Sequence, residues 1–212
     1  DVPSKLLWDE SVRKRLEGID LILSCGDLPK KYLEYLTNFT TVPILYVHGN
    51  HDGSYKESEP GGCICVDDQV YVWKGLRIMG LGGSIRYNRE ETFQYTEKEM
   101  RRRMRRLWFK AHRAGGIDLL LTHSPAAGLN DGNDRAHKGF ACFNDLLEEY
   151  QPKWFVHGHV HLSYNANLPR VCTHGQTTVI NATERYTFEI PDPDPVARKR
   201  FFWNDPAFPT KN

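Results

Sequence analysis

Four short apolar segments of this sequence are each followed directly by residues of the types that bind metal ions in proteins. In chain order, the four motifs are Gly26-Asp27, Gly49-Asn50-His51-Asp52, Thr122-His123-Ser124-Pro125 and His157-Gly158-His159-Val160-His161. Carboxylate, amide and imidazole groups together form an oxygen and nitrogen ligand set for divalent metals such as Mn, Fe, Zn or Co. The glycines allow the backbone to turn sharply and to approach a ligand closely. The spacing therefore indicates a metal-dependent site that is assembled from four separate segments.

Each motif has a simpler interpretation when it is taken alone. A Gly-Asp pair is usually a turn, and a single histidine at the end of a strand is more often a hydrogen-bonded structural residue than a ligand. The tetrapeptides GNHD and GHVH are more specific. Independent structural roles would not explain why all four motifs occur together, each directly after an apolar segment. We therefore predict that they form one functional site.

The elements that must position these residues alternate between strand and helix. Predicted strands cover residues 19–25, 42–47, 118–122 and 153–157, with further short β segments in 61–83, around Val171 and in 177–181. Predicted helices cover residues 4–17, 29–38, 96–113 and 140–150. The first of these strands is expected to be buried on both faces. This order is typical of an α/β protein with mostly parallel central strands, in which ligands bind beyond the carboxyl ends of the strands.

The order GD, GNHD, H and GHVH resembles the calcineurin-like metallophosphoesterase family, over about residues 1–182. The resemblance implies an α/β fold in which a two-sheet β-sandwich is flanked by helices, in four layers, α/β/β/α. We expect a single domain over residues 1–190, with a strand of that domain missing before residue 1, and an extended C-terminal tail over residues 191–212.

The resemblance also implies roles for individual residues. The implied metal ligands are Asp1, Asp27, Asn50, His123, His159 and His161. Asp27 would bridge two ions, and His161 would bind a different ion from His123 and His159. His51 would be the catalytic residue that contacts the leaving-group or phosphoryl oxygen.

The first motif of the family, DxH, departs from its pattern here because it occurs as Asp1-Val2-Pro3. Pro3 stands where a histidine ligand belongs, and proline has no donor atom for a metal. One of the two sites would then keep only Asp1, Asp27, His161 and solvent. His48 and His157 either compensate as ligands or, with Asp52, support the ligands from behind.

The chemistry implied by the resemblance is hydrolysis of a phosphate ester by metal-activated hydroxide at a dinuclear centre. We expect two divalent transition metal ions, Mn, Fe, Zn or Co, with Mn favoured, and a small phosphate ester or diester as substrate. Candidate substrate-binding residues are Arg86 and Tyr87, in a glycine-rich segment, and His137, in the polar loop 128–140. Two alternatives stay open: a non-catalytic or mononuclear binding scaffold, because of Pro3, and a metal-dependent nuclease.

Composition limits the class of protein. The chain has 212 residues and a net charge of +1, and it contains no apolar run long enough to span a membrane. Five cysteines do not suggest a disulfide framework, so we expect a cytoplasmic protein without membrane contact. Oligomerisation through the C-terminal tail is an open expectation.

The predicted helix 96–113 combines an apolar stripe with a cluster of arginines. The stripe consists of Met100, Met104, Leu107, Trp108 and Ala111, and the arginines are Arg101, Arg102, Arg103, Arg105 and Arg106. We interpret the arginines as a solvated face rather than a track for nucleic-acid phosphates, because acidic residues lie nearby and the chain is nearly neutral overall. Nucleic acid is therefore not an expected partner.

Overall fold

Two β-sheets lie face to face in the computed structural model, which describes residues 2–9, 11–88, 92–163 and 168–191. The smaller sheet is parallel and has the order β1 (Ile22–Ser24), β2 (Ile44–Tyr46), β3 (Ile64–Cys65). The larger sheet has the order β10 (Val171–His174), β11 (Thr177–Asn181), β9 (Trp154–His157), β8 (Leu119–Thr122), β5 (Leu76–Leu81), β4 (Gln69–Trp73). Its four central strands are parallel, and the two outer strands, β10 and β4, are antiparallel to their neighbours.

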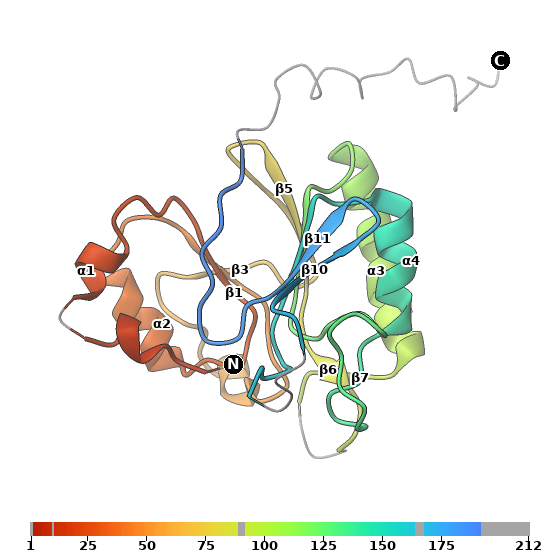
Figure 1. The fold of residues 1–212 in the computed structure, drawn as a ribbon, viewed down its shortest axis with the longest axis horizontal. Helices are drawn as coiled ribbons and strands as arrows, with labels where there is room; N and C mark the ends of the chain where they lie inside the picture. Colours follow the sequence, from red (N-terminus) through yellow and green to blue (C-terminus); the bar gives the residue numbers. More distant parts are fainter. Residues whose placement is uncertain (1, 10, 89–91, 164–167, 192–212) are drawn as a thin grey trace.

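Helices cover the outer face of each sheet (Figure 1). A 3₁₀ turn η1 (Lys5–Leu7), α1 (Val12–Arg15) and α2 (Lys30–Thr37) lie on the small sheet, whereas α3 (Glu97–Arg113) and α4 (Ala141–Tyr150) lie on the large sheet. A 3₁₀ turn η2 (Gly53–Lys56) follows β2, and β6 (Ser84–Ile85) pairs with β7 (Gln94–Tyr95) beyond the end of β5. The predicted α/β/β/α layering is confirmed.

Three apolar clusters fill the spaces between the sheets and between each sheet and its helices. They arise because successive side chains of a strand point to opposite faces. In β2, Leu45 lies in the cluster between the two sheets, while Ile44 and Tyr46 lie in the cluster against α1 and α2. In β9, Val156 faces the small sheet and Phe155 faces α3 and α4. The central strands are therefore buried on both faces, which explains their continuous apolar runs.

Two sequence predictions fail in the first 25 residues. Residues 4–17 form η1 and α1 rather than one helix, because the Asp9 carboxylate accepts hydrogen bonds from the backbone N and the hydroxyl of Ser11 and so competes with helical pairing. The strand predicted over 19–25 is also less buried than expected. β1 is an edge strand of the small sheet, and its residues Ile22 and Leu23 are only half-buried.

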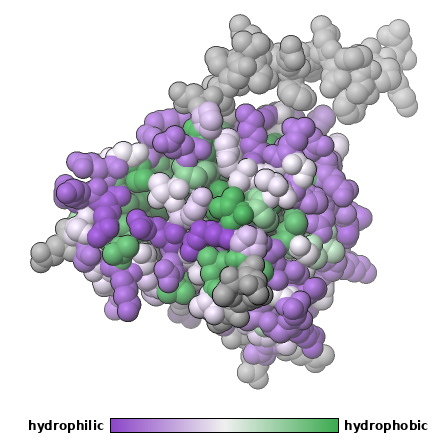
Figure 2. All heavy atoms as spheres, viewed as in Figure 1, coloured by the Kyte–Doolittle hydropathy of each residue, from purple (hydrophilic) through white to green (hydrophobic). Residues whose placement is uncertain are grey.

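Helix α3 begins as the sequence predicts but packs differently. Thr96 and Glu99 form a reciprocal capping box at its N-terminus. Arg103, expected in solvent, is buried, whereas Trp108, expected in the apolar stripe, is 44% exposed. The polar side chains of the two flanking layers are visible in Figure 2, with apolar side chains showing mainly between them.

Two further findings concern membrane-spanning helices and the ends of the described chain. No helix in the described ranges is long and apolar enough to cross a membrane. Asp1 and the predicted tail from residue 192 onward lie outside the described residues, so the predicted division at residue 190 stays a prediction.

Candidate metal centre

The candidate ligands lie where four parallel strands end. Asp27 follows β1, Asn50 follows β2, His123 directly follows β8, and His159 comes two residues after β9. Ligand atoms of Asp27, His123 and His159 all lie within 4.8 Å of one another. The structure therefore brings together three residues that the sequence predicts as metal ligands.

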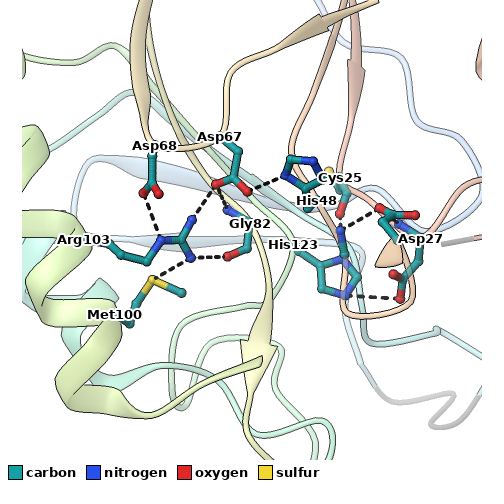
Figure 3. Close-up of polar contacts among 11 residues, drawn as sticks. Cys25, Asp27, His48, Asp67, Asp68, Gly82, Met100, Arg103 and His123 are labelled. Carbon is teal, nitrogen blue, oxygen red and sulfur yellow. Dashed lines mark hydrogen bonds and ion pairs between the residues drawn. The ribbon is translucent and has the colours of Figure 1, made fainter. Parts of the chain in front are cut away.

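The tautomer of His123 leaves its Nε2 lone pair facing the other ligands. His123 is fully buried, and burial lowers its pKa to about 3, so the ring is neutral and carries a single proton. Its Nδ1 lies 2.7 Å from the carbonyl oxygen of Cys25, which can only accept a hydrogen bond, so the proton is on Nδ1 (Figure 3).

Two oxygens meet that lone pair. Asn50 Oδ1 lies 3.0 Å from His123 Nε2, and Asp27 Oδ2 lies 3.4 Å from it. The Asn50 amide is oriented by its Nδ2, which donates to the hydroxyl of Tyr87 at 3.1 Å. Three atoms that can each donate an electron pair thus converge, an arrangement that a cation would stabilise. The donor set, one imidazole nitrogen, one amide oxygen and one carboxylate oxygen, fits a divalent transition metal.

His159 is fixed by the loop between β8 and α4. Its Nε2 donates to the carbonyl of Ala136 at 2.7 Å. The lone pair of the neutral ring that can bind a metal is therefore on Nδ1. Asp134 in turn accepts hydrogen bonds from the backbone N of Ala136 and His137, at 2.9 and 3.1 Å. Burial is the main reason that the pKa of His159 falls to about 3, so this ring also stays neutral and able to bind a metal.

Close backbone packing sets the position of Asp27. Gly26 has φ +90°, and a Cβ on Gly49 would lie 2.5 Å from Asp27 Cγ. Asp52 joins the two loops by accepting from the backbone N of Asp27 at 2.9 Å and of Gly49 at 2.7 Å. Its pKa is raised to about 6 by burial. Glycine is thus required here because the loops touch through their backbones.

The residues implied for a second ion lie differently. His161 is half-buried, is outside the group formed by Asp27, His123 and His159, and has a pKa lowered mainly by burial. Asp1 lies outside the described residues. Pro3 lines an open groove of about 600 Å³ together with Lys5, Trp8, Pro29 and Lys31. Within the described ranges, one group of three potential ligand residues is found.

The predicted catalytic residue and two of the predicted substrate contacts, Tyr87 and His137, lie against candidate ligands, whereas Arg86 contacts other residues. His51 is exposed, and its backbone N donates to Asp27 Oδ1 at 2.7 Å, so it also holds the carboxylate in place. His137 lies with its ring 5.2 Å from that of His159, and its Nδ1 contacts Asp134. Arg86 donates to Glu99 at 2.9 Å and to the carbonyl of Gln94 at 3.1 Å.

The predicted supporting histidines have distinct surroundings. His48 Nδ1 lies 2.8 Å from Asp67 Oδ2. His157 is fully buried, its Nδ1 lies 3.0 Å from the carbonyl of Gly158, and burial lowers its pKa to about 4. Two further charged residues, Asp67 and Arg103, have side chains buried beside His48 and were not predicted from the sequence. The only signal for them was an arginine next to the apolar stripe of a helix.

Comparisons with known proteins agree with the geometry. The sequence model described as Calcineurin-like phosphoesterase matches residues 5–163. UPF0046 protein C25E10.12 of Caenorhabditis elegans is 38% identical over 73 residues, covering 31% of this chain and 24% of that protein. Human Metallophosphoesterase domain-containing protein 1 is 32% identical over 71 residues, covering 32% and 20%. These matches therefore span a quarter or less of the length of either relative.

The fold is also found in a solved structure. The protein TT1561 of Thermus thermophilus superimposes with a TM-score of 0.55 at 16% sequence identity, covering 82% of this chain and 83% of that protein. At this identity, the match supports the architecture of the chain and says nothing about its substrate.

Proposed function

This chain belongs to the calcineurin-like phosphoesterase family, and on that premise we propose that it is a metal-dependent hydrolase of small phosphate esters, including diesters. The observation that carries the proposal is the convergence of the His123 Nε2 lone pair with oxygens of Asn50 and Asp27. Such an arrangement has little value in a scaffold without metal, because it places electron-rich atoms together in a buried site.

Asp27, Asn50, His123 and His159 would hold one divalent ion, and Asp27, His161 and Asp1 would hold a second. We favour Mn for both. Bound ions of this kind supply Lewis-acid stabilisation of phosphate oxygens and generate a nucleophile from water near neutral pH. The protein's own contribution is to fix the neutral tautomers of His123 and His159 through the carbonyls of Cys25 and Ala136.

His51 would bind the leaving-group oxygen of the ester and donate a proton to it. Its side chain is exposed while its backbone is held against Asp27. General acid catalysis of this type contributes about 10²–10⁴-fold to the rate. His137 and Tyr87 remain the proposed contacts to phosphate, and Arg86 would join them only by exchanging its partner Glu99 for the ester.

The organic part of the ester would occupy the open groove lined by Pro3, Trp8 and Pro29. Pro29 lies two residues after Asp27 in the sequence, and this proximity along the chain is what supports the assignment. A cytoplasmic location fits all five cysteines, which are free thiols.

The test is hydrolysis of bis-p-nitrophenyl phosphate by protein that has been stripped with chelator and then reloaded with Mn²⁺. We expect turnover to return with Mn²⁺, and His123→Ala to abolish both turnover and bound metal. His112→Ala is the matched control, because His112 is exposed on α3, and it should keep both. Absence of turnover in protein with confirmed metal content would disprove the proposal.

A mononuclear centre is a second candidate, favoured by Pro3 and by the single group of three ligand residues among the described parts of the chain. Elemental analysis distinguishes the two, since the dinuclear centre requires two equivalents of metal. A nuclease is a weaker candidate. Arg101 pairs with Asp145, and Arg103 pairs with Asp67, so neither is left to bind phosphates of a nucleic acid. Binding to DNA that depends steeply on salt would favour it.

A further inference from the structure

A group of charged side chains, of which Arg103 and Asp67 are buried, lies beside the proposed metal centre and connects helix α3 to the loop that carries Asn50 (Figure 3). Its centre is Arg103, whose side chain is 7% exposed. Arg103 donates from Nη2 to Asp67 at 2.6 Å, from Nε to Asp68 at 2.9 Å and from Nη1 to the carbonyl of Gly82 at 2.7 Å. The guanidinium also lies over the ring of Tyr95 at 4.2 Å.

Asp67 connects Arg103 to His48 through hydrogen bonds to both. Its Oδ1 accepts from Arg103 and from the backbone N of Gly82, and its Oδ2 accepts from His48 Nδ1 at 2.8 Å. Burial alone would raise the pKa of Asp67, but His48 and Arg103 more than offset it and hold that pKa below its ordinary value. The carboxylate is therefore ionised and accepts hydrogen bonds with both oxygens.

His48 is held on several sides. Its ring stacks on Phe93 at 4.2 Å, and its carbonyl accepts from the backbone N of Gly83 at 2.7 Å. The next residue, Gly49, packs against Asp27 without room for a Cβ, and Asn50 follows it. A displacement of His48 would therefore shift both Gly49 and Asn50 relative to Asp27.

We propose that Asp67 and Arg103 are positioning residues of the metal centre, which act on Asn50 and Asp27 through His48 and Gly49. The inference rests on the metal centre of the proposed function but not on hydrolysis. Buried ion pairs add little net stability compared with apolar residues of the same volume. What this pair provides is a fixed geometry, which a metal site needs because metal–ligand distances vary by only about 0.2 Å.

The same large sheet contains a matched ion pair away from the site. Asp118 binds Arg77 through Nε at 2.8 Å and Nη2 at 2.6 Å. These residues lie at the starts of β8 and β5, whereas His123 and Gly82 follow the ends of the same strands. Asp118→Asn thus removes a comparable charge without touching the ligands.

The experiment titrates Co²⁺ into metal-free wild type, Asp67→Asn, Arg103→Met and Asp118→Asn, followed by visible absorption and calorimetry. We expect Asp67→Asn and Arg103→Met to weaken Co²⁺ affinity about 10- to 100-fold and to alter the absorption band. Asp118→Asn should lower the melting temperature but keep both the affinity and the band. If Asp67→Asn does not fold, His48→Asn, which keeps a donor for Asp67, is compared with His48→Phe, which keeps only the ring.

Several outcomes would overturn the inference. Equal Co²⁺ affinity in wild type and Asp67→Asn would do so, as would equal losses in Asp67→Asn and Asp118→Asn, or equal affinities in the two His48 variants. Failure of the wild type to bind Co²⁺ would refute the metal centre and the inference together. Weakened binding in the Asp67 variant, together with no ester hydrolysis by loaded wild type, would support the positioning role and refute only the phosphoesterase.

Discussion

Replacing Gly49 by alanine tests the geometry of the metal centre through a residue that has no ligand atom of its own. A Cβ at this position would lie 2.5 Å from Asp27 Cγ and 2.6 Å from Asp27 N. Carbon atoms in contact need about 3.5 Å, so the two loops must separate by about 1 Å. That displacement is about five times the 0.2 Å over which metal–ligand distances vary. We therefore expect metal affinity to fall about 100-fold, the upper end of the range for changes around a site.

The assay is the rise in melting temperature on adding Mn²⁺ to chelator-stripped protein. At a Mn²⁺ concentration of about 100 times the wild-type Kd, binding stabilises the wild type by about 2.7 kcal/mol. In a chain of this size, this corresponds to a rise of about 5–11 °C. With affinity 100-fold lower, Gly49→Ala would gain about 0.4 kcal/mol, which is a rise of about 1–2 °C.

The matched control is Gly61→Ala. Gly61 is exposed, and its Cβ would meet only Glu34 Oε1, at 3.4 Å. Gly61→Ala should show the full wild-type rise. The clash at position 49 also lowers the stability of the metal-free protein, by about 1–3 kcal/mol, so only the difference between metal-loaded and metal-free samples is compared. A full Mn²⁺-dependent rise in Gly49→Ala would refute the claim that close packing of Gly49 on Asp27 sets the ligand geometry.

Three further predictions follow from particular contacts. Tyr87→Phe removes the hydroxyl that accepts from Asn50 Nδ2, and calorimetry should show Mn²⁺ affinity lowered by about 2- to 10-fold, the equivalent of one hydrogen bond; an unchanged affinity would contradict this. Because the pKa of His157 is lowered to about 4, the unfolded chain takes up a proton that the native state does not as pH falls below 6.5, so the stability of metal-free protein should fall from pH 6.5 towards pH 4. Denaturant unfolding should show this slope reduced by up to about 1.4 kcal/mol per pH unit in His157→Phe, and an identical slope would count against it. Thr96→Ala removes the capping box of α3 and should lower the free energy of unfolding by about 1 kcal/mol, with metal affinity unchanged. A loss of affinity in this variant would show that α3 acts on the site through its whole length.

The apolar runs were sufficient to predict an α/β fold and the segments that carry the ligands, whereas the two-sheet layering was implied by the family resemblance. Parallel strands buried on both faces appear as short apolar runs, and polar residues directly after such runs must lie at one edge of the sheets. Prediction was weaker for residues 4–17, because a local bond between Asp9 and Ser11 overrides a helical pattern. The limited burial of β1 depends on which strands pair with it, and a single segment does not show its neighbours.

The supporting contacts of the site were not predictable for a different reason. The carbonyls of Cys25 and Ala136 fix the tautomers of His123 and His159, and every residue has a carbonyl. Which carbonyl meets which ring is decided by tertiary packing, so no residue type marks it in the sequence.

The burial of Arg103 was not predictable from the sequence for the same reason, because it too depends on tertiary contacts. A helical pattern assigns an arginine to the solvated face, and its neighbours along α3 follow that rule. The exception arises because Asp67 and Asp68, 36 and 35 residues away in sequence, meet the guanidinium with good geometry. An arginine in a helix is buried only where carboxylates compensate its charge. A buried arginine whose carboxylate partner also binds the histidine before a ligand loop is therefore the contact through which helix α3 and the proposed metal centre would form one structural unit.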